Sequence, residues 1–396
     1  VQVYYSAPQG KLGKPSKELA TFKKTKLLNP NETEELTLSF AVNDMASFDD
    51  LGKIQKSAYL LEKGDYKVYV ASSVRDTVDT GFVYSVSEDT VTQQFTSYCA
   101  PVALEKRMVS DGSFEKLPKG EIKNAYPVNE EIKATAPEER LWFHDVDTEE
   151  QLDSFIMQIK ADELIEFMGG YSCTGVSNTG CFPRCYSVAV PPMATADGPA
   201  GLRLFEKIGI PTTAFPCATL IACSWNTEIM EQIGATGGLE VKENNIAFWL
   251  TPALNIHRSP LCGRNFEYFS EDPVVSGEMA AAKVKGMQSV GVGCTIKHLA
   301  CNNKEENRFC SDSRVSERAL REIYLKGFEI SVKKANPWGL MTSYNAINGV
   351  HTSESYELLG GILRGEWGFK GLVTTDWGVK NNPVNEVKAG NDIKMH

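Results

Sequence analysis

The sequence lacks several features that would each fix a class of protein. Its longest apolar stretch, at residues 246–256, is far short of the ~20 residues that a membrane helix needs. It has no long basic cluster, and 51 acidic against 41 basic side chains give a net charge of −10. Nucleic acids and anionic membranes are therefore poor candidate partners. No GxSxG occurs, and no GxGxxG follows the first predicted strand, which argues against a serine hydrolase of that type and a dinucleotide-binding fold.

The cysteines form no dense framework. The ten residues are spread singly over 396 positions, which predicts reduced thiols and a cytoplasmic or otherwise reducing setting. The one local cluster, Cys173, Cys181 and Cys185, lacks the fourth ligand and the paired short spacings of a zinc site, so we expect no metal and no cofactor. No signal peptide is visible. The chain opens on Val1 within a strand-like run instead of on Met, which predicts that further residues precede it in the parent protein.

The first quarter of the chain alternates apolar and polar residues. Strands are predicted at residues 1–7, 34–42, 66–72 and 81–86, with turn signals between them. An immunoglobulin-type sandwich has about seven strands, and we count five or six. The sequence therefore predicts an incomplete all-β sandwich in residues 1–95 that lacks its first strands. Residues 96–147 are polar without a sustained period and are predicted to form a linker.

From residue 148 onward, helical and strand patterns alternate. A helix is predicted over 149–169, followed by strands near 193–196, 216–222, 248–255, 293–296, 339–342, 372–375 and 393–395, with helices such as 276–290, 317–335 and 358–367 between them. Repeated β-α units indicate a parallel sheet. Seven or eight units favour a closed α/β TIM-like barrel over residues 148–396. The chain stops after the last strand, which predicts a barrel closed by another segment or truncated at its C-terminus.

Polar residues follow the predicted strands and should converge on one face of the barrel. They include Asp197, Arg264, Lys297, His298, Tyr344 and Asp376. Such a set suits a ligand with many hydroxyls, and Tyr344 and Trp377 offer faces to a sugar ring. Individual alternatives stay open. Taken alone, Asp376 is more typical of a helix N-cap than of a catalytic acid. Lys297 could instead form an ion pair inside the barrel. Loop bracing is the alternative for Arg203, Glu267, Arg308 and Arg314.

Several long strings occur in one order at consistent spacings. They are ADGPAGLR, GRNFEYFSEDP, KHLACNNKEENR, SERALREIYLKGFE, MTSYNAINGV, LLGGILRGEWGFKGLVTTDWG and AGNDIKM. Residues 148–396 thereby resemble the catalytic barrel of glycoside hydrolase family 3, the β-glucosidase group. Residues 1–95, with KGDYKVYVASS, resemble the fibronectin type III-like domain of that family. This order resembles the permuted members, in which an α/β sandwich domain precedes the fibronectin-like domain.

The resemblance implies a retaining β-glycosidase without a cofactor, most simply a β-glucosidase acting on a β-linked oligosaccharide or glycoside. Asp376, in Thr375-Asp376-Trp377, matches the nucleophile, and Asp197 matches the carboxylate that holds hydroxyls far from the anomeric carbon. The remaining implied substrate-binding residues are Arg264, Lys297, His298, Tyr344, Met341, Trp377 and, with a less defined role, Glu305.

Retaining hydrolysis needs two carboxylates about 5–5.5 Å apart. In this family the general acid/base usually comes from the sandwich domain, for which residues 1–95 leave no room. We therefore expect it on a second polypeptide or a missing segment. Rival hypotheses are a family member acting on β-xylosides or N-acetylglucosaminides, a Schiff-base aldolase using Lys297, and a non-catalytic carbohydrate-binding module.

Overall fold

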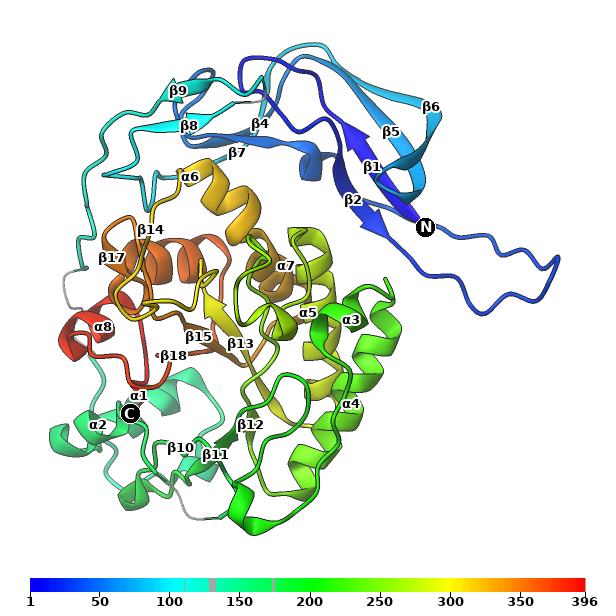
Figure 1. Ribbon diagram of the computed structural model, residues 1–396. Coiled ribbons are helices and arrows are strands. Elements are labelled where there is room, and N and C mark those ends of the chain that lie inside the picture. The colour runs from blue at the N-terminus through cyan, green and yellow to red at the C-terminus, as the bar shows by residue number, and fades with distance from the viewer. Residues whose placement is uncertain (110, 128–132, 173–174, 396) are drawn as a thin grey trace.

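A computed structural model describes residues 1–109, 111–127, 133–172 and 175–395. A β-rich N-terminal part lies across one side of a larger part in which helices surround a curled sheet (Figure 1). Within the described ranges, no helix combines the length and the apolar composition needed to cross a bilayer.

The N-terminal part contains two antiparallel sheets. The first has the order β2-β1-β5-β6, with β1 at Gln2–Ser6, β2 at Glu18–Phe22, β5 at Gly64–Ser73 and β6 at Asp76–Val86. The second has the order β3-β4-β7, with β3 at Ser47–Asp49, β4 at Ala58–Leu61 and β7 at Thr90–Gln94. The predicted count of five or six strands was thus too low, because strands of three or four residues show no measurable alternation.

The strand predicted at residues 34–42 is wrong. These residues pair with no strand; they belong to a long segment that leaves β2 and projects from the β-rich part before η1 at Val42–Met45 (Figure 1). Alternation predicts a strand only where a partner edge is available, and none lies beside this segment.

The segment predicted as a linker contains a short hairpin, β8 at Lys106–Met108 and β9 at Phe114–Lys116. Arg107 fastens the hairpin to the β-rich part through Asp50, with Nη1 2.9 Å from Oδ2. Nearby, the Cys99 carbonyl accepts a hydrogen bond from Asn348 Nδ2 at 2.7 Å. In its described residues the segment therefore runs along the larger part and is attached to it.

The larger part is built on a sheet with the order β10-β11-β12-β13-β15-β18. These strands are β10 at Cys181–Phe182, β11 at Met193–Ala196, β12 at Phe248–Trp249, β13 at Gly293–Leu299, β15 at Gly339–Thr342 and β18 at Leu372–Thr374. All neighbours pair in parallel except β10 with β11. Single bridges link the two edges of this sheet: Thr374 of β18 pairs with Ile393, Lys394 pairs with Gly169, and Tyr171 pairs with Cys181 of β10. The sheet is therefore curled and barrel-like.

Two expectations for this sheet are corrected. Residues 216–222 contain helix α3 at Ala218–Ala222 instead of a strand, since a short apolar run does not by itself distinguish the two. Residues 393–395 contribute bridges instead of a full strand. The predicted helix 149–169 is divided into α1 at Glu149–Met157 and α2 at Ala161–Phe167.

Helices pack around the sheet, with α4 against α5 and α5 against α7. Their bounds are Thr227–Glu243 for α4, Pro273–Ser289 for α5, Glu317–Ala319 for α6, Lys326–Ala335 for α7 and Pro383–Ala389 for α8. Two further segments, η6 at Leu320–Tyr324 and η8 at Glu357–Glu366, are π-helical. The backbones of α4 and α5 approach closely: a Cβ on Gly286 would lie 2.0 Å from the Glu231 carbonyl oxygen. The remaining short elements are η2 at Phe143–Asp145, η3 at Tyr186–Val188, η4 at Glu206–Ile208, η5 at Asn265–Glu267, β14 at Asp312–Ser313, β16 at Ala346–Ile347, β17 at Val350–His351 and η7 at Thr352–Glu354.

A buried arginine network joins the two parts. Arg321 donates to Glu366 at 2.6 and 2.9 Å and to Glu317 at 3.0 Å. Its guanidinium lies 4.8 Å from the ring centre of Phe48 in β3. One turn earlier, Arg318 donates to main-chain carbonyls of the β-rich part. The position of the β-rich part therefore depends on cations of the α6–η6 segment.

We predict that Arg321→Met lowers the free energy of unfolding by about 3–5 kcal/mol, because Glu317 and Glu366 would stay buried without their cation. Urea unfolding measures this change. The matched control is Lys333→Ala, which breaks the exposed Lys333–Glu329 pair and should cost at most about 1 kcal/mol. Equal effects of the two substitutions would contradict the assigned role of Arg321.

Candidate active site

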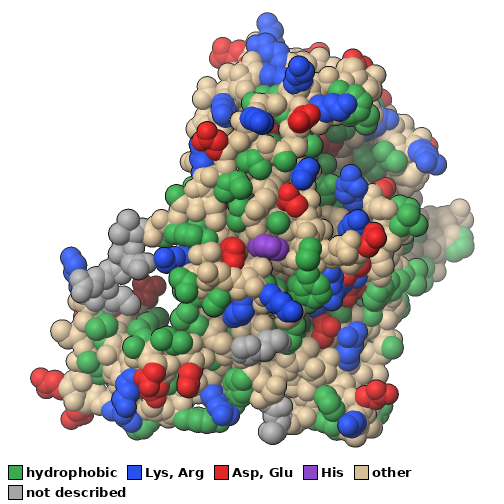
Figure 2. Space-filling model, turned by 60° about the vertical axis from the view of Figure 1, so that its left-hand side comes forward, with side chains coloured by type: hydrophobic (Ala, Val, Ile, Leu, Met, Phe, Trp, Pro, Cys, Tyr) green, Lys and Arg blue, Asp and Glu red, His purple; other side chains and the backbone are tan. Residues whose placement is uncertain are grey.

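The strand ends bring the predicted polar residues together. Asp197 follows β11, Lys297 and His298 lie in β13, and Asp376 follows β18 by two residues. Because these strands are neighbours or near neighbours in a parallel sheet, their carboxyl ends meet at one edge. On the face that Figure 2 shows, charges of both signs are interspersed with apolar groups and form no basic patch.

Asp197 and Lys297 form an ion pair. Lys297 Nζ donates to Asp197 Oδ1 at 2.6 Å, and Arg203 Nη1 lies 3.4 Å from Oδ2. Burial raises the pKa of the Asp197 carboxyl, but Lys297 and Arg203 outweigh it and lower this pKa to about 2. The ion pair considered as an alternative for Lys297 is thus present. Asp197 is a permanently ionised acceptor, able to accept hydrogen bonds from hydroxyl groups.

His298 sits at a break in the ladder. The β13–β15 register shifts between Lys297 and Leu299, as at the bulges that re-aim side chains beside active sites. The Asn255 amide replaces the missing ladder bonds: it accepts from His298 N and donates to His298 O, both at 2.8 Å. This paired contact fixes the backbone of His298.

The His298 ring is neutral. Burial, then Arg264 and Lys297, lower its pKa well below the usual range. Arg264 Nη2 lies 3.2 Å from Nε2, and because a guanidinium only donates, Nε2 is the acceptor. The proton then resides on Nδ1, which lies 3.5 Å from the Tyr268 hydroxyl.

Asp376 is buried with one oxygen unpaired. Its Oδ1 accepts from Trp377 N at 2.8 Å. Its Oδ2 lies 3.5 Å from His298 Nε2, which carries no proton, and accepts no hydrogen bond of ordinary geometry from the described residues. The Tyr344 hydroxyl nevertheless acts on this carboxyl as a hydrogen-bond donor. Burial raises the pKa of Asp376, partly opposed by Lys297 and Arg264. No helix starts at residue 377, and α8 is capped by Asn382. The N-cap interpretation of Asp376 is therefore wrong.

Two further carboxylates near this cluster are bound to cations. Glu267 accepts from Arg264 Nε at 2.7 Å, and Glu305 accepts from Arg308 Nη1 at 2.9 Å. Arg308 therefore braces its loop as predicted.

Tyr344 and Met341 come from β15 and the residues after it. The guanidinium carbon of Arg308 also lies 4.5 Å from the ring centre of Tyr344, and burial, then Asp376, raise the pKa of that tyrosine. Met341 is buried on β15 opposite Lys297. The indole of Trp377 donates to Thr179 O at 2.8 Å. The structure thus places every predicted site residue at this edge of the sheet or on its flanking loops.

Sequence reasoning missed Asn255 and Tyr268, which orient His298, and the stacking of Arg308 on Tyr344. A single amide or hydroxyl that bonds to another residue's backbone or ring leaves no periodic signal. Among the cysteines, Cys173 lies outside the described residues, whereas Cys181 is disulfide-bonded. The expectation of reduced thiols throughout is therefore wrong at Cys181. Within the described chain, no group of three or more His, Cys, Asp or Glu side chains is arranged to hold a metal ion.

We predict that Asp376→Asn raises the thermal unfolding midpoint at pH 7. Because the folded pKa of Asp376 is raised, the folded state binds this proton more tightly than the unfolded chain, and ionisation destabilises the fold as pH rises through that pKa. The gain should be a few degrees, at roughly 2–4 °C per kcal/mol, and should vanish at pH values below the unfolded pKa. Scanning calorimetry across pH measures it.

The control is Asp162→Asn, at an exposed position of α2, which should leave the midpoint unchanged. A gain for Asp376→Asn that does not depend on pH would argue against an ionised, unpaired carboxylate at this position.

Comparison with known proteins identifies the family of this chain. The family model described as "Glycosyl hydrolase family 3 N terminal domain" matches residues 186–395, and the fibronectin type III-like domain matches residues 1–74. β-Glucosidase A of Butyrivibrio fibrisolvens is 46% identical over all of this chain and 51% of its own length. A β-glucosidase structure from Paenibacillus barengoltzii superposes with a TM-score of 0.91 at 37% identity, over the whole chain and 46% of that protein.

A second structure, β-glucosidase 3B from Thermotoga neapolitana in complex with α-D-glucose, is 46% identical over 62% of this chain and 36% of its own, with a TM-score of 0.60. The chain spans about half the length of the curated relatives it matches. With a family model over more than half of its residues, and a relative aligned along its entire length, the chain belongs to glycoside hydrolase family 3.

Proposed function

We propose that this chain supplies the sugar-binding and nucleophilic half of a retaining β-glycoside hydrolase, most simply a β-glucosidase. The observation that carries the proposal is the Asp376 carboxyl, buried beside a cluster of cations with Oδ2 unpaired. An unpaired oxygen in a desolvated site is available to a reacting carbon. The relatives named β-glucosidases support the substrate class.

In the proposed reaction, Asp376 Oδ2 attacks the anomeric carbon and forms a glycosyl ester, while the bond to the leaving oxygen breaks and that oxygen takes a proton from a general acid. Water, deprotonated by the same acid/base group, then cleaves the ester and restores Asp376. Asp197 and Lys297 hold hydroxyls far from the anomeric carbon. Arg264 and His298 bind the same sugar. Four further residues line its subsite: Tyr344, Met341, Trp377 and Glu305.

We propose that the acid/base carboxylate comes from a sandwich domain outside this chain. Asp197, Glu267 and Glu305 each contact a cation of this chain at 2.6–2.9 Å, so none of these three carboxyl groups is free to act on a leaving oxygen. The relatives are about twice as long as this chain, which leaves room for another domain. The proposed organisation is a fibronectin type III-like sandwich at 1–95, a linker at 96–147 and a TIM-like barrel at 148–396.

We predict covalent labelling of Asp376 by a 2-deoxy-2-fluoro-β-glucoside with a dinitrophenolate leaving group, which departs without protonation. Mass spectrometry of the digested protein should locate one fluoroglucosyl group on the peptide containing Asp376. Asp376→Asn should remain unlabelled, and Asp162→Asn should label as the unaltered chain does. A label on another residue would refute Asp376 as the nucleophile.

We further predict that the 396-residue chain alone hydrolyses an aryl β-glucoside with a poor leaving group about 10²–10⁴-fold more slowly than the completed protein, because general acid catalysis is missing. Adding the sandwich domain of a relative should restore the rate, and Asp376→Asn should abolish the restoration. Full activity of the chain alone would overturn the assignment of the acid/base. Sugar binding without hydrolysis in the completed protein would favour a carbohydrate-binding module.

A further inference from the structure

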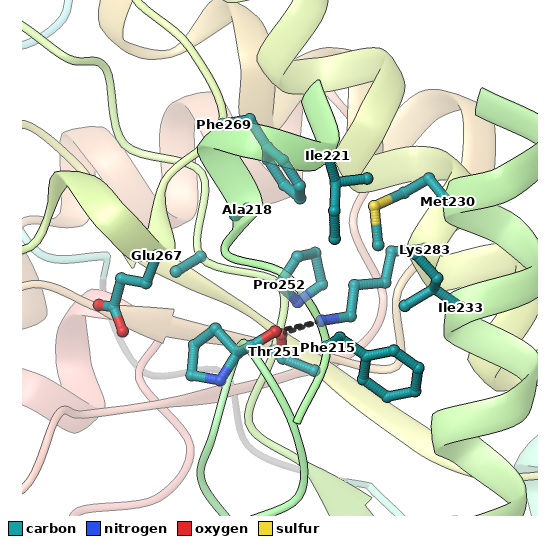
Figure 3. A pocket seen from close by; sticks show the side chains of 12 residues that line it. Phe215, Ala218, Ile221, Met230, Ile233, Thr251, Pro252, Glu267, Phe269 and Lys283 are labelled. Atoms are coloured by element: carbon teal, nitrogen blue, oxygen red, sulfur yellow. Dashed lines mark hydrogen bonds between the residues drawn. The ribbon is translucent and has the colours of Figure 1, made fainter. Parts of the chain in front are cut away.

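A fully buried lysine that the proposed mechanism does not use lies directly behind the site. Lys283 extends from α5 into the wall between helix and sheet, where Nζ donates to Pro199 O at 2.7 Å and to Thr251 Oγ1 at 3.0 Å. Figure 3 shows its amine bonded to Thr251 at the edge of a cavity lined by apolar side chains such as Ile221, Met230 and Phe269.

The number of N–H groups on the Lys283 amine matches the two acceptors, Pro199 O and Thr251 Oγ1. Burial, reinforced by Lys297 and opposed by Glu267, lowers the pKa of Lys283 to about 7. A neutral amine has two N–H groups, and both have partners; in the charged form the remaining N–H is accommodated by the Trp249 ring, whose centre lies 4.7 Å from Nζ. Lys283 is thus held by the backbone of one loop and the side chain of another.

These two loops each position part of the sugar site. Pro199 lies two residues after Asp197, in a turn closed by the bond from Gly201 N to Gly198 O at 3.0 Å. Gly198 has φ +114°, and a Cβ there would lie 1.9 Å from Gly201 O, so no side chain at position 198 can help to anchor the turn. Thr251 begins the segment that leads to Asn255, the residue that fixes the His298 backbone.

We propose that Lys283 is a positioning residue of the sugar site: by bridging Pro199 O and Thr251 Oγ1 it holds the Asp197 turn at a fixed place relative to the segment that positions His298. This inference rests on the proposed function. Since Asp197 would contact hydroxyls far from the anomeric carbon, Lys283 should govern how tightly the sugar is held and not the rate of the covalent step.

The test uses the labelling reaction on the full chain. The concentration dependence of labelling by the 2-fluoro-β-glucoside gives a half-saturating concentration and a maximum rate constant. Lys283→Met, which keeps the chain length and removes both donors, should raise the half-saturating concentration about tenfold, as expected for a lost buried hydrogen bond. Its maximum rate constant should stay within about twofold. Thr251→Val should shift the concentration in the same direction by less.

Met230→Leu, which alters the same cavity without touching a polar contact, is the control and should change neither constant. Equal effects of Lys283→Met and Met230→Leu, or a loss confined to the maximum rate constant, would overturn the positioning role. Absence of any label on Asp376 in the unaltered chain would instead count against the proposed function.

A crystal structure of a variant tests directly whether Lys283 holds the Asp197 turn in place. In Lys283→Met, or in Thr251→Val if the first variant does not fold, the Asp197–Lys297 contact of 2.6 Å should lengthen as the turn moves. A turn that stays in place would refute the inference whatever the labelling shows.

Discussion

The site depends on the desolvation of several charges within one small volume. Lys297 lies against Asp197 at 2.6 Å and also acts on Asp376, where it opposes the rise in pKa that burial causes. Isolated buried charges are strongly unfavourable, whereas paired ones with satisfied hydrogen bonds are tolerated. The distribution of partners is therefore informative: Asp197, Glu267 and Glu305 each have a cation at hydrogen-bond distance, and Asp376 has only longer-range ones. Asp376 is thus the one of these four carboxylates without a cation at hydrogen-bond distance, and this difference supports it as the proposed nucleophile.

Neutral His298 explains why Asp376 keeps this free oxygen. A charged imidazole would donate to Oδ2 and form an ion pair that lowers nucleophilicity. Burial and the positive charges of Arg264 and Lys297 prevent that protonation, and the donor of Arg264 occupies the Nε2 lone pair. Arg264 in turn is oriented by Glu267 at 2.7 Å. Glu267, Arg264 and His298 thus act in series on Asp376. Substitution of any of the three should change the hydrogen bonding or the pKa of the Asp376 carboxyl.

Sequence reasoning placed Asp197 and Asp376 just after strands because buried parallel strands are short apolar runs followed by a polar residue. It ended the β13 strand at residue 296, whereas that strand continues through Lys297 and His298, and it extended β12 to residue 255, whereas that strand ends at Trp249. It failed where the deciding contact is not local. Residues 216–222 have the composition of a strand but pack as α3, and residues 34–42 alternate without a partner edge. Asn255 and Lys283 act through backbone carbonyls and amides brought close only by folding. Neither the spacing nor the composition of the sequence therefore predicts the roles of these two residues.

The β-rich part is connected to the candidate site through its contacts with the α6–η6 segment. The loop after β13 carries Glu305 and Arg308, and it leads directly into the α6–η6 segment. There Glu322 accepts from Phe48 N, and Arg318 donates to the carbonyls of Leu12 and Gly13 at 2.8 and 2.9 Å. These bonds hold one end of the loop whose other end is fixed by the β13 strand. Because the guanidinium carbon of Arg308 lies 4.5 Å from the ring centre of Tyr344, a displacement of the β-rich part would be transmitted to one wall of the proposed sugar site. The N-terminal part is therefore a structural support for the loop after β13, even though none of the predicted site residues lies in it.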